Sequence, residues 1–524
     1  MTEHKEVLTL EEEKEAAAKA AEEEKLNKPI TFKFLLSFTI PTILSFIIMG
    51  IFGTIDGVFA ARGINQEALG AINFVMPFFT FTMAIGAMLS IGGTALIAKK
   101  KGKKLLQEAR ENFTLLTLVT FVTSMIISVV GWFARSPLLR LLGTDSDVFD
   151  LALEYIQPLI LMMPFIMVGM FLVQLMIAEG RPVLSMFASS SGALVSTSLN
   201  ALFIFVFDLG VMGLALATGI GYAVPTILGM IYFTFSRKKG IYFVRPKWDI
   251  RALGRSSMNG ISEMVTMLAT TVTTIVMNNV LVRIVGWEGV AAAGIALAGM
   301  GILSSLFFGY ASGIAPVVSY NFGKKKHYGA DSEIGQERHG NLKKLYKKSL
   351  IIVAALSVIA LVGTLIFADL MVRIYVSPND VCVHLNGLVQ SVCSAHLPVY
   401  EYMSGYGAVP MEYLTAWGGE MCTGHLHAMS VRGLRIISFG FLLMGFNVFA
   451  TAWFTAFNDG LVSGFMSLMR TMVFTLTLLV TLPRIITPSL DGAWLAMPLA
   501  EVLAIVVTIF FLRKMGKKYY YREG

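Results

Sequence analysis

Long apolar runs without charged residues dominate this chain. A helix needs about 20 predominantly apolar residues to cross the hydrocarbon core of a bilayer. Two such runs, 461–483 and 492–512, each contain a single charge, Arg470 and Glu501. Ten others contain none: 34–55, 68–98, 113–134, 155–178, 183–207, 209–236, 264–282, 289–323, 349–368 and 436–458. Because strands of a transmembrane barrel alternate apolar and polar residues, continuous runs predict an all-α integral membrane protein with twelve transmembrane helices.

The low content of charged residues supports this class. Charged residues make up 15% of the chain, against about 25% in soluble globular proteins. This composition excludes a disordered protein, a disulfide scaffold and a secreted enzyme. The first apolar run is long and follows an acidic tail, which does not resemble a cleaved signal peptide.

Lysine and arginine are distributed unevenly between the two sides of the expected membrane domain. Cytoplasmic loops carry the excess of these residues. With both termini cytoplasmic, the inner segments hold 33 of the 42 basic residues and the outer loops hold eight. We therefore expect a multi-pass protein of the cell (cytoplasmic) membrane with both termini inside. The net charge of +8 follows from this topology, so no nucleic-acid partner is expected.

The chain contains an internal repeat. Gly92 pairs with Gly313 and Gly102 pairs with Gly323, both at a spacing of 221 residues. Six spans in each half give both halves the same orientation, which predicts a parallel repeat about an axis along the membrane normal. Transporters with such repeats hold substrate near the midplane between the halves. One chain supplies both halves, so a monomer is sufficient.

The expected organisation has five parts. They are a cytoplasmic tail over 1–30, a first six-helix half over 31–236, a cytoplasmic linker over 237–256, a second six-helix half over 257–513 with an extracellular insertion near 381–428, and a cytoplasmic tail over 514–524.

The insertion explains a change in the repeat spacing. The tripeptide AEG at 178–180 pairs with NDG at 458–460 at a spacing of 280, so the second half carries extra residues. A zinc site or a disulfide is possible outside the cell, but the spacings fit no known zinc finger, and a variable surface insertion is favoured. The Cys and His residues concerned are Cys382, Cys393, Cys422, His384, His396, His425 and His427.

Several short motifs, in order along the chain, resemble the MATE (multidrug and toxin extrusion) family. They are DGVFAARG at 56–63, ALGA at 68–71, AEGRP at 178–182, FIF at 203–205 with Gly210 and Gly213 after it, Pro316, Ser319 and Gly323, and GAWLAMP at 492–498. The resemblance covers about 30–515 apart from the insertion. It implies a cation-coupled antiporter, not an enzyme, that exports small organic, often cationic and amphipathic, compounds in exchange for Na⁺ or H⁺ by alternating access.

Two carboxylates are candidates for ion coupling, because a charge inside a membrane is costly and marks a functional site by default. Asp56 closes the first span, and the resemblance implies a role in cation coupling. Glu263 begins the seventh span, although the NorM-like branch has its glutamate about two turns later, near Thr270. In the DinF-like branch an aspartate stands where this chain has Asn200, which cannot titrate.

Other polar residues are assigned to the substrate cavity or to a structural ion pair. Arg470 and Glu501 lie at equal depth on consecutive spans, roughly 17 and 18 Å from the cytoplasmic ends at 1.5 Å per residue. Charged residues inside membrane spans are usually paired with one another, so we expect Arg470 and Glu501 to form a buried structural ion pair. The expected cavity residues are Gln174, Asn200, Asn278 and Asn447. No bound metal and no cofactor other than the coupling ion are expected.

Other functions remain to be weighed. A flippase of lipid-linked saccharides from the same superfamily is the main alternative, and more basic residues in the cavity than Arg470 alone would favour it. A major-facilitator transporter would show a G-x-x-x-D-x-x-G-R-R-type motif after the second span, where AKKKGKK stands at 98–104. The histidines form no catalytic cluster in the sequence, and no G-x-x-x-x-G-K-[ST] loop for an ATP-driven pump occurs.

Overall fold

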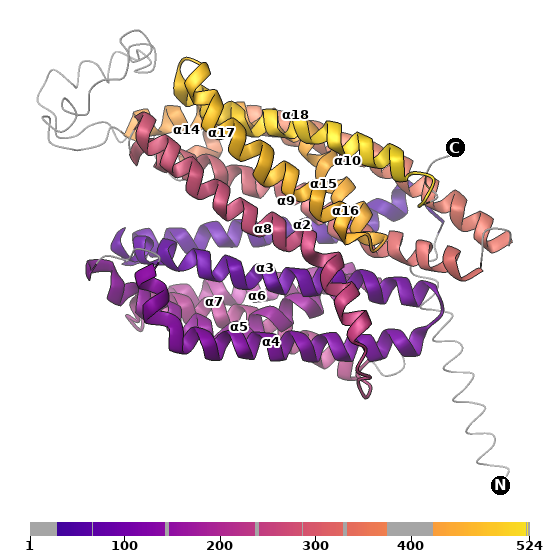
Figure 1. The fold of residues 1–524 in the computed structure, drawn as a ribbon. Coiled ribbons are helices and arrows are strands. Elements are labelled where there is room, and N and C mark those ends of the chain that lie inside the picture. The colour runs from indigo at the N-terminus through magenta and orange to yellow at the C-terminus, as the bar shows by residue number, and fades with distance from the viewer. Residues whose placement is uncertain are drawn as a thin grey trace, which may run out of the picture.

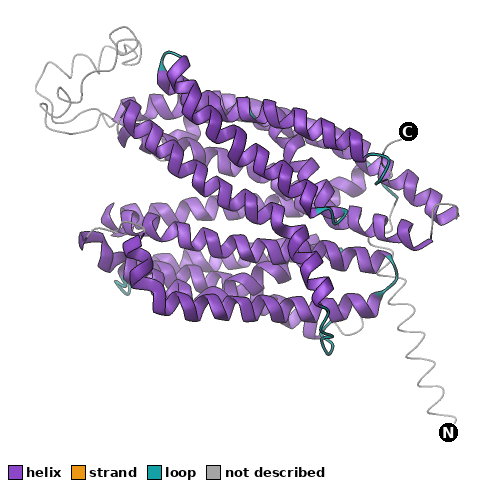
Figure 2. Cartoon of the chain, in the orientation of Figure 1, coloured by secondary structure: helices purple, strands orange, loops and turns teal. Residues whose placement is uncertain are grey.

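The computed structural model describes residues 29–64, 66–141, 146–235, 240–285, 287–328, 333–374, 423–519 and 521. Within these ranges the chain forms helices joined by short loops, and no strand is present (Figure 2). The first half contains α2 (Phe32–Val58), the π-helix η1 (Phe59–Ile64), α3 (Gln66–Gly102), α4 (Leu106–Leu141), α5 (Ser146–Ala178), α6 (Pro182–Phe205) and α7 (Gly210–Phe235).

The second half has the same number of spans, although two of its spans are interrupted or bent. It contains α8 (Ile250–Val285), α9 (Trp287–Tyr328), α10 (Glu333–Arg373), α14 (Thr423–Ser438), α15 (Phe441–Ala456), α16 (Gly460–Leu468), the π-helix η2 (Met469–Phe474), α17 (Thr475–Ile485) and α18 (Ser489–Met515). Eleven helices are long and apolar enough to cross a membrane, and one bent pair completes twelve. The prediction of an all-α membrane protein with twelve spans is confirmed.

The tenth span differs from the expected continuous helix over 436–458. It is a pair of helices, Leu426–Ser438 and Phe441–Ala456, bent by 55°. The break falls at Gly440, where a Cβ atom would lie 3.1 Å from the carbonyl oxygen of Ile437 and 3.2 Å from Pro498 Cα. Because α14 already begins at Thr423, the end of the expected insertion is helical. Its cysteines lie outside the described residues, so the structure tests neither the favoured surface insertion nor the zinc and disulfide alternatives.

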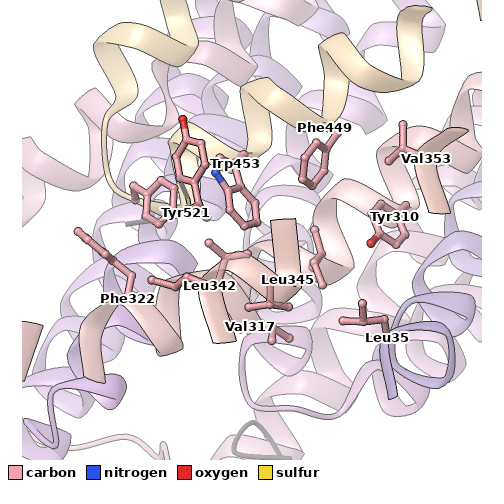
Figure 3. Packing of buried hydrophobic residues seen from close by; sticks show 14 of the residues in the cluster. Leu35, Tyr310, Val317, Phe322, Leu342, Leu345, Val353, Phe449, Trp453 and Tyr521 are labelled. Carbon is pink, nitrogen blue, oxygen red and sulfur yellow. The ribbon is translucent and has the colours of Figure 1, made fainter. Parts of the chain in front are cut away.

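The two halves form two groups of helices, α3–α7 and α9–α18, seen one above the other in Figure 1. The first helix of each half joins them. Helix α2 packs on α6 of its own half and on α9 of the other, and α8 packs on α16 and on α3. The largest buried cluster shows this exchange, because Leu35 of α2 lies with Tyr310 of α9, Leu345 of α10 and Trp453 of α15 (Figure 3).

A repeated glycine pair brings the two halves into close contact near one end of α3 and α9. A Cβ atom at Gly102 would lie 2.1 Å from the carbonyl oxygen of Tyr320, and one at Gly323 would lie 2.2 Å from the carbonyl oxygen of Lys99. These separations leave no room for a side chain. The two glycines occupy equivalent positions in the repeat, so each half contributes the same small residue to one crossing.

The segment between the halves is attached to the first half. Glu179 follows α5 and its side chain is 1% exposed. It accepts a hydrogen bond from Lys101 Nζ at 2.7 Å and one from the backbone N–H of Ile241 at 3.5 Å. Arg110 Nε donates to the carbonyl oxygen of Gly240 at 2.7 Å. The start of the linker is therefore held by α3, α4 and α5.

The second half holds its own following segment in the same way. Asp459 stands at the turn after α15, where the repeat places Glu179 in the first half. It accepts a hydrogen bond from the hydroxyl of Tyr519 and lies 3.4 Å from Lys518 Nζ. In both halves an acidic residue after the fourth span therefore binds the chain that follows the sixth.

Candidate functional site

A cavity of about 70 Å³, with apolar walls and several polar side chains, lies between the two halves. Its walls come from α2, α3 and α5 of the first half and from α8, α9, α15 and η2 of the second. The polar residues that line it are Thr94, Gln174, Glu263, Thr266, Ser312, Thr451, Thr455 and Arg470. Drug-sized ligands occupy about 300–1,000 Å³, so this volume suits an ion or a few solvent molecules, and a larger substrate requires the halves to separate.

One hydrogen bond crosses the cavity from half to half. Ser312 Oγ of α9 donates to Gln174 Oε1 of α5 at 3.0 Å. Of the four residues that we expected to line the substrate cavity, Gln174 alone is in the lining of this cavity. Its contact with Ser312 was not anticipated, because a lone serine in an apolar helix carries no signal of its partner.

The second half contributes a buried arginine and two carboxylates. Arg470 is 6% exposed, and its Nη1 lies 3.2 Å from Glu501 Oε1. Glu263 lines the same cavity as Arg470 and interacts with its charge. The structure thus brings Glu263, which the sequence singled out for ion coupling, together with Arg470 and Glu501, which it singled out as a pair.

The guanidinium sits on one of the two π-helices. In η2 the wider turn lets the hydroxyl of Thr475 donate to the carbonyl oxygen of Arg470 at 2.8 Å. Single π turns inside α-helices occur often at functional sites. With one cation and two carboxylates, this cluster carries a formal charge of −1 when all three groups are ionised.

Asn447 orients the second carboxylate of this cluster. Its Nδ2 donates to Glu501 Oε2 at 2.6 Å, and its Oδ1 accepts from the hydroxyl of Thr508 at 2.7 Å. Asn447 is outside the cavity lining and acts through Glu501. Asn278 is half-buried on α8, also outside the lining.

A second carboxylate site lies within the first half. Asn200 of α6 is fully buried, and its Nδ2 donates to Asp56 Oδ1 of α2 at 2.6 Å. The rings of Tyr155 and Tyr222, on α5 and α7, are near enough for their hydroxyls to interact with the charge of Asp56. The sequence identified Asp56 and Asn200 but not the two tyrosines, because tyrosine in an apolar run commonly marks only the membrane interface.

The chain resembles characterised transporters in sequence. The MatE family model matches residues 41–202. The chain is 25% identical over 301 residues to the multidrug export protein MepA of Staphylococcus saprophyticus, covering 56% of this chain and 66% of that protein. It is 21% identical over 358 residues to the protein of the same name from Staphylococcus aureus strain MSSA476, covering 68% and 76%. The match to the first of these spans just under two thirds of that relative.

The fold also matches solved structures. A multidrug resistance MATE family transporter of the MOP superfamily, in an outward-facing conformation, superposes with a TM-score of 0.77 at 17% identity, covering 93% of this chain and 96% of that one. A MOP superfamily transporter from Pyrococcus furiosus, described as having a binding pocket of reverse polarity, gives 0.74 at 18% identity, with coverage of 93% and 96%. At these identities the similarity concerns the fold. The sequence match over residues 41–202 and the shared fold together make this chain similar to the transporters of the MATE family.

Proposed function

We propose that this protein is a secondary active antiporter that exports small organic, often cationic and amphipathic, compounds in exchange for Na⁺ or H⁺. The observation that carries the proposal is the cavity between the halves, which contains Glu263 beside Arg470. The names of the curated relatives, multidrug export proteins, support the substrate class.

The charge of the central cluster gives exchange a physical basis. When Glu263 and Glu501 are both ionised, Arg470 balances one of them and leaves one negative charge in a membrane-embedded cluster. An uncompensated charge there is costly, so the cluster binds either a coupling cation or a cationic substrate. Because both neutralise the same charge, they compete, and competition for one site is what antiport requires.

The Asp56–Asn200 site provides a second carboxylate at which Na⁺ or H⁺ binds. Asp56 does not line the cavity, so ion binding at this site would affect substrate binding by moving α2, the helix that carries Asp56. This helix contacts both halves, and the hydroxyl of Thr42 donates to the carbonyl oxygen of Gly309 of α9 at 2.9 Å. A change in the position of α2 on ion binding therefore alters the packing between the halves.

We place the protein in the cytoplasmic membrane of the cell, with both termini in the cytoplasm. The excess of Lys and Arg on that side supports it. In this orientation the crossing of Gly102 and Gly323 closes the cytoplasmic side. One chain supplies every residue of the site, so a monomer carries out transport.

Export of ethidium from cells that express the protein tests the proposal, with Na⁺ and pH gradients imposed one at a time. We expect gradient-driven export that is lost in Asp56→Asn or Glu263→Gln. Glu154→Gln is the matched control, because Glu154 is an exposed carboxylate of α5, and it retains export.

Three outcomes oppose parts of the proposal. Absence of export under both gradients, with normal amounts of protein in the membrane, contradicts drug antiport. Translocation of a lipid-linked saccharide in proteoliposomes would then support the flippase. Export that survives both substitutions contradicts the coupling sites and leaves the transporter in place.

A further inference from the structure

A groove lies at one end of the second half, between α10 and α18. Its volume is about 560 Å³. Lys343 and Lys347 of α10 and Arg513 of α18 line it together with two tyrosines and two aliphatic side chains, and its lining contains no acidic residue among the described part of the chain. Three of the seven side chains that line the groove are therefore basic.

The inner wall of the groove is a packed aromatic surface. The rings of Tyr346 and Tyr521 lie 4.8 Å apart, and Tyr521 is 2% exposed. Its hydroxyl donates to the carbonyl oxygen of Leu512 at 2.9 Å. Behind it, the ring of Trp453 of α15 lies 5.7 Å away (Figure 3). Since α15 packs against both α10 and α18, this wall has a fixed position between them.

The groove lies at the boundary of the apolar spans. Lys347 stands two residues before the apolar run 349–368, and Arg513 directly follows the run 492–512. From this level, both helices continue into the membrane with apolar side chains on their surfaces. Ile351 of α10 is 58% exposed, and Val506 and Ile509 of α18 are 65% and 42% exposed. A charged end therefore adjoins an apolar surface of the kind that contacts acyl chains.

We propose that this groove binds an anionic phospholipid, with the phosphate group between Lys343, Lys347 and Arg513 and the acyl chains along the apolar surfaces of α10 and α18. Basic pockets between transmembrane helices on the cytoplasmic side bind anionic headgroups. A soluble phosphate compound would use the basic residues alone, whereas a phospholipid uses both parts of the surface. The proposal goes beyond transport, since lipid binding requires neither a gradient nor a drug.

Native mass spectrometry of the full-length protein, released from nanodiscs with equal amounts of phosphatidylglycerol and phosphatidylcholine, tests the proposal. We expect wild-type protein to retain phosphatidylglycerol preferentially. Each basic residue near an anionic surface contributes about 1 kcal/mol, or about fivefold. The double variant Lys347→Gln/Arg513→Gln should therefore lose about 25-fold of the preference.

The matched control is Lys344→Gln/Lys517→Gln. It removes one exposed lysine from α10 and one from the segment after α18, neither of which lines the groove. We expect it to keep most of the preference, and we expect millimolar inorganic phosphate to leave lipid retention unchanged. An equal loss in both double variants, an unchanged preference in the groove variant, or displacement of the lipid by phosphate overturns the proposal. Both variants should export ethidium measurably, which separates this test from that of the transport function.

Discussion

The side-chain amide of Asn200 donates a hydrogen bond of 2.6 Å to the carboxylate of Asp56, which joins α6 to α2. The two residues are 144 positions apart in the chain. An amide donor stabilises the ionised carboxylate and leaves its second oxygen for another ligand. The second half uses the same type of pairing, from Asn447 to Glu501.

Removing the amide should weaken ion coupling. A hydrogen bond to a charged group contributes about 1.5–3 kcal/mol, so we expect Asn200→Ala to lower the rate of gradient-driven export at least about tenfold. The initial rate of ethidium export in cells measures this. Asn279→Ala serves as control, because Asn279 is exposed and donates to Ile275 of its own helix. Equal rates for wild type and Asn200→Ala would show that the hydrogen bond has no role in coupling.

Breaking the central ion pair should destabilise the protein. Arg470→Gln leaves Glu263 and Glu501 without their common cation, and removing one partner of a buried pair costs about 3–5 kcal/mol. Thermal unfolding of the purified protein in detergent should show a clear loss. The double variant Arg470→Gln/Glu501→Gln should be more stable than the single one, because fewer unbalanced charges remain. Arg432→Gln at the more exposed pair with Asp491 provides the comparison, and a similar small loss in all three would contradict the argument.

Adding side chains at the glycine crossing should separate the halves at that end. Gly102→Ala/Gly323→Ala places a Cβ atom about 2 Å from a backbone oxygen on each side. We expect faster labelling of a cysteine at Ser256→Cys, a fully buried position of α8, by a thiol reagent applied from the cytoplasm. The three native cysteines are replaced by serine in all variants.

The control for this experiment is another pair of glycines. Gly254→Ala/Gly340→Ala introduces the same two methyl groups where a Cβ meets no atom within 4 Å. Its labelling rate should equal that of the unmodified chain. If the two double variants label at the same rate, the crossing of Gly102 and Gly323 does not hold the halves together.

Loss of the carboxylate that holds the linker should also reduce stability. Glu179→Gln removes a buried ion pair with Lys101. The side chain of Lys101 is 7% exposed and that of Glu179 is 1% exposed. We expect a loss of about 3–5 kcal/mol, visible as a lower midpoint of thermal unfolding. Glu108→Gln disrupts a nearby pair with Lys100 in which the glutamate is 51% exposed, and there the loss should be below about 1 kcal/mol. Equal midpoints for the two variants would contradict a structural role for Glu179.

The number and order of the spans could be predicted from sequence because each apolar run is long enough by itself to fix a helix in a membrane. The bent tenth span could not. Its first part, α14, contains Arg432 and Arg435. Because we identified spans as apolar runs without charges, this segment was not counted as part of a span. The break falls at Gly440, where a Cβ atom would lie 3.2 Å from Pro498 Cα of α18, and this close approach of two helices has no signature in either segment.

The sequence identified individual site residues better than their partners. The equal depth of Arg470 and Glu501 on consecutive spans was sufficient to suggest a pair, and the two side chains are in contact. Asp56 and Asn200 were singled out for separate reasons, and their hydrogen bond depends on the packing of α2 against α6, which has no signature in either segment. The same holds for Gln174 and Ser312, on opposite sides of the cavity.

The π-helix η2 has a consequence for the chain length of the eleventh span. A helix of 3.6 residues per turn rotates by about 100° for each residue, and the wide turn of Met469–Phe474 accommodates one more residue than an α-helix would. Deleting a single residue there would restore regular winding with little net rotation of α17 relative to α16, because the wide turn already absorbs the extra residue. The carbonyl oxygens of Arg470 and Thr471 both lie in this turn, where they accept from the hydroxyl of Thr475 at 2.8 Å and from Thr273 Oγ1 at 2.9 Å. The extra residue therefore changes the backbone beside Arg470 while the inner and outer parts of this span keep their angular register.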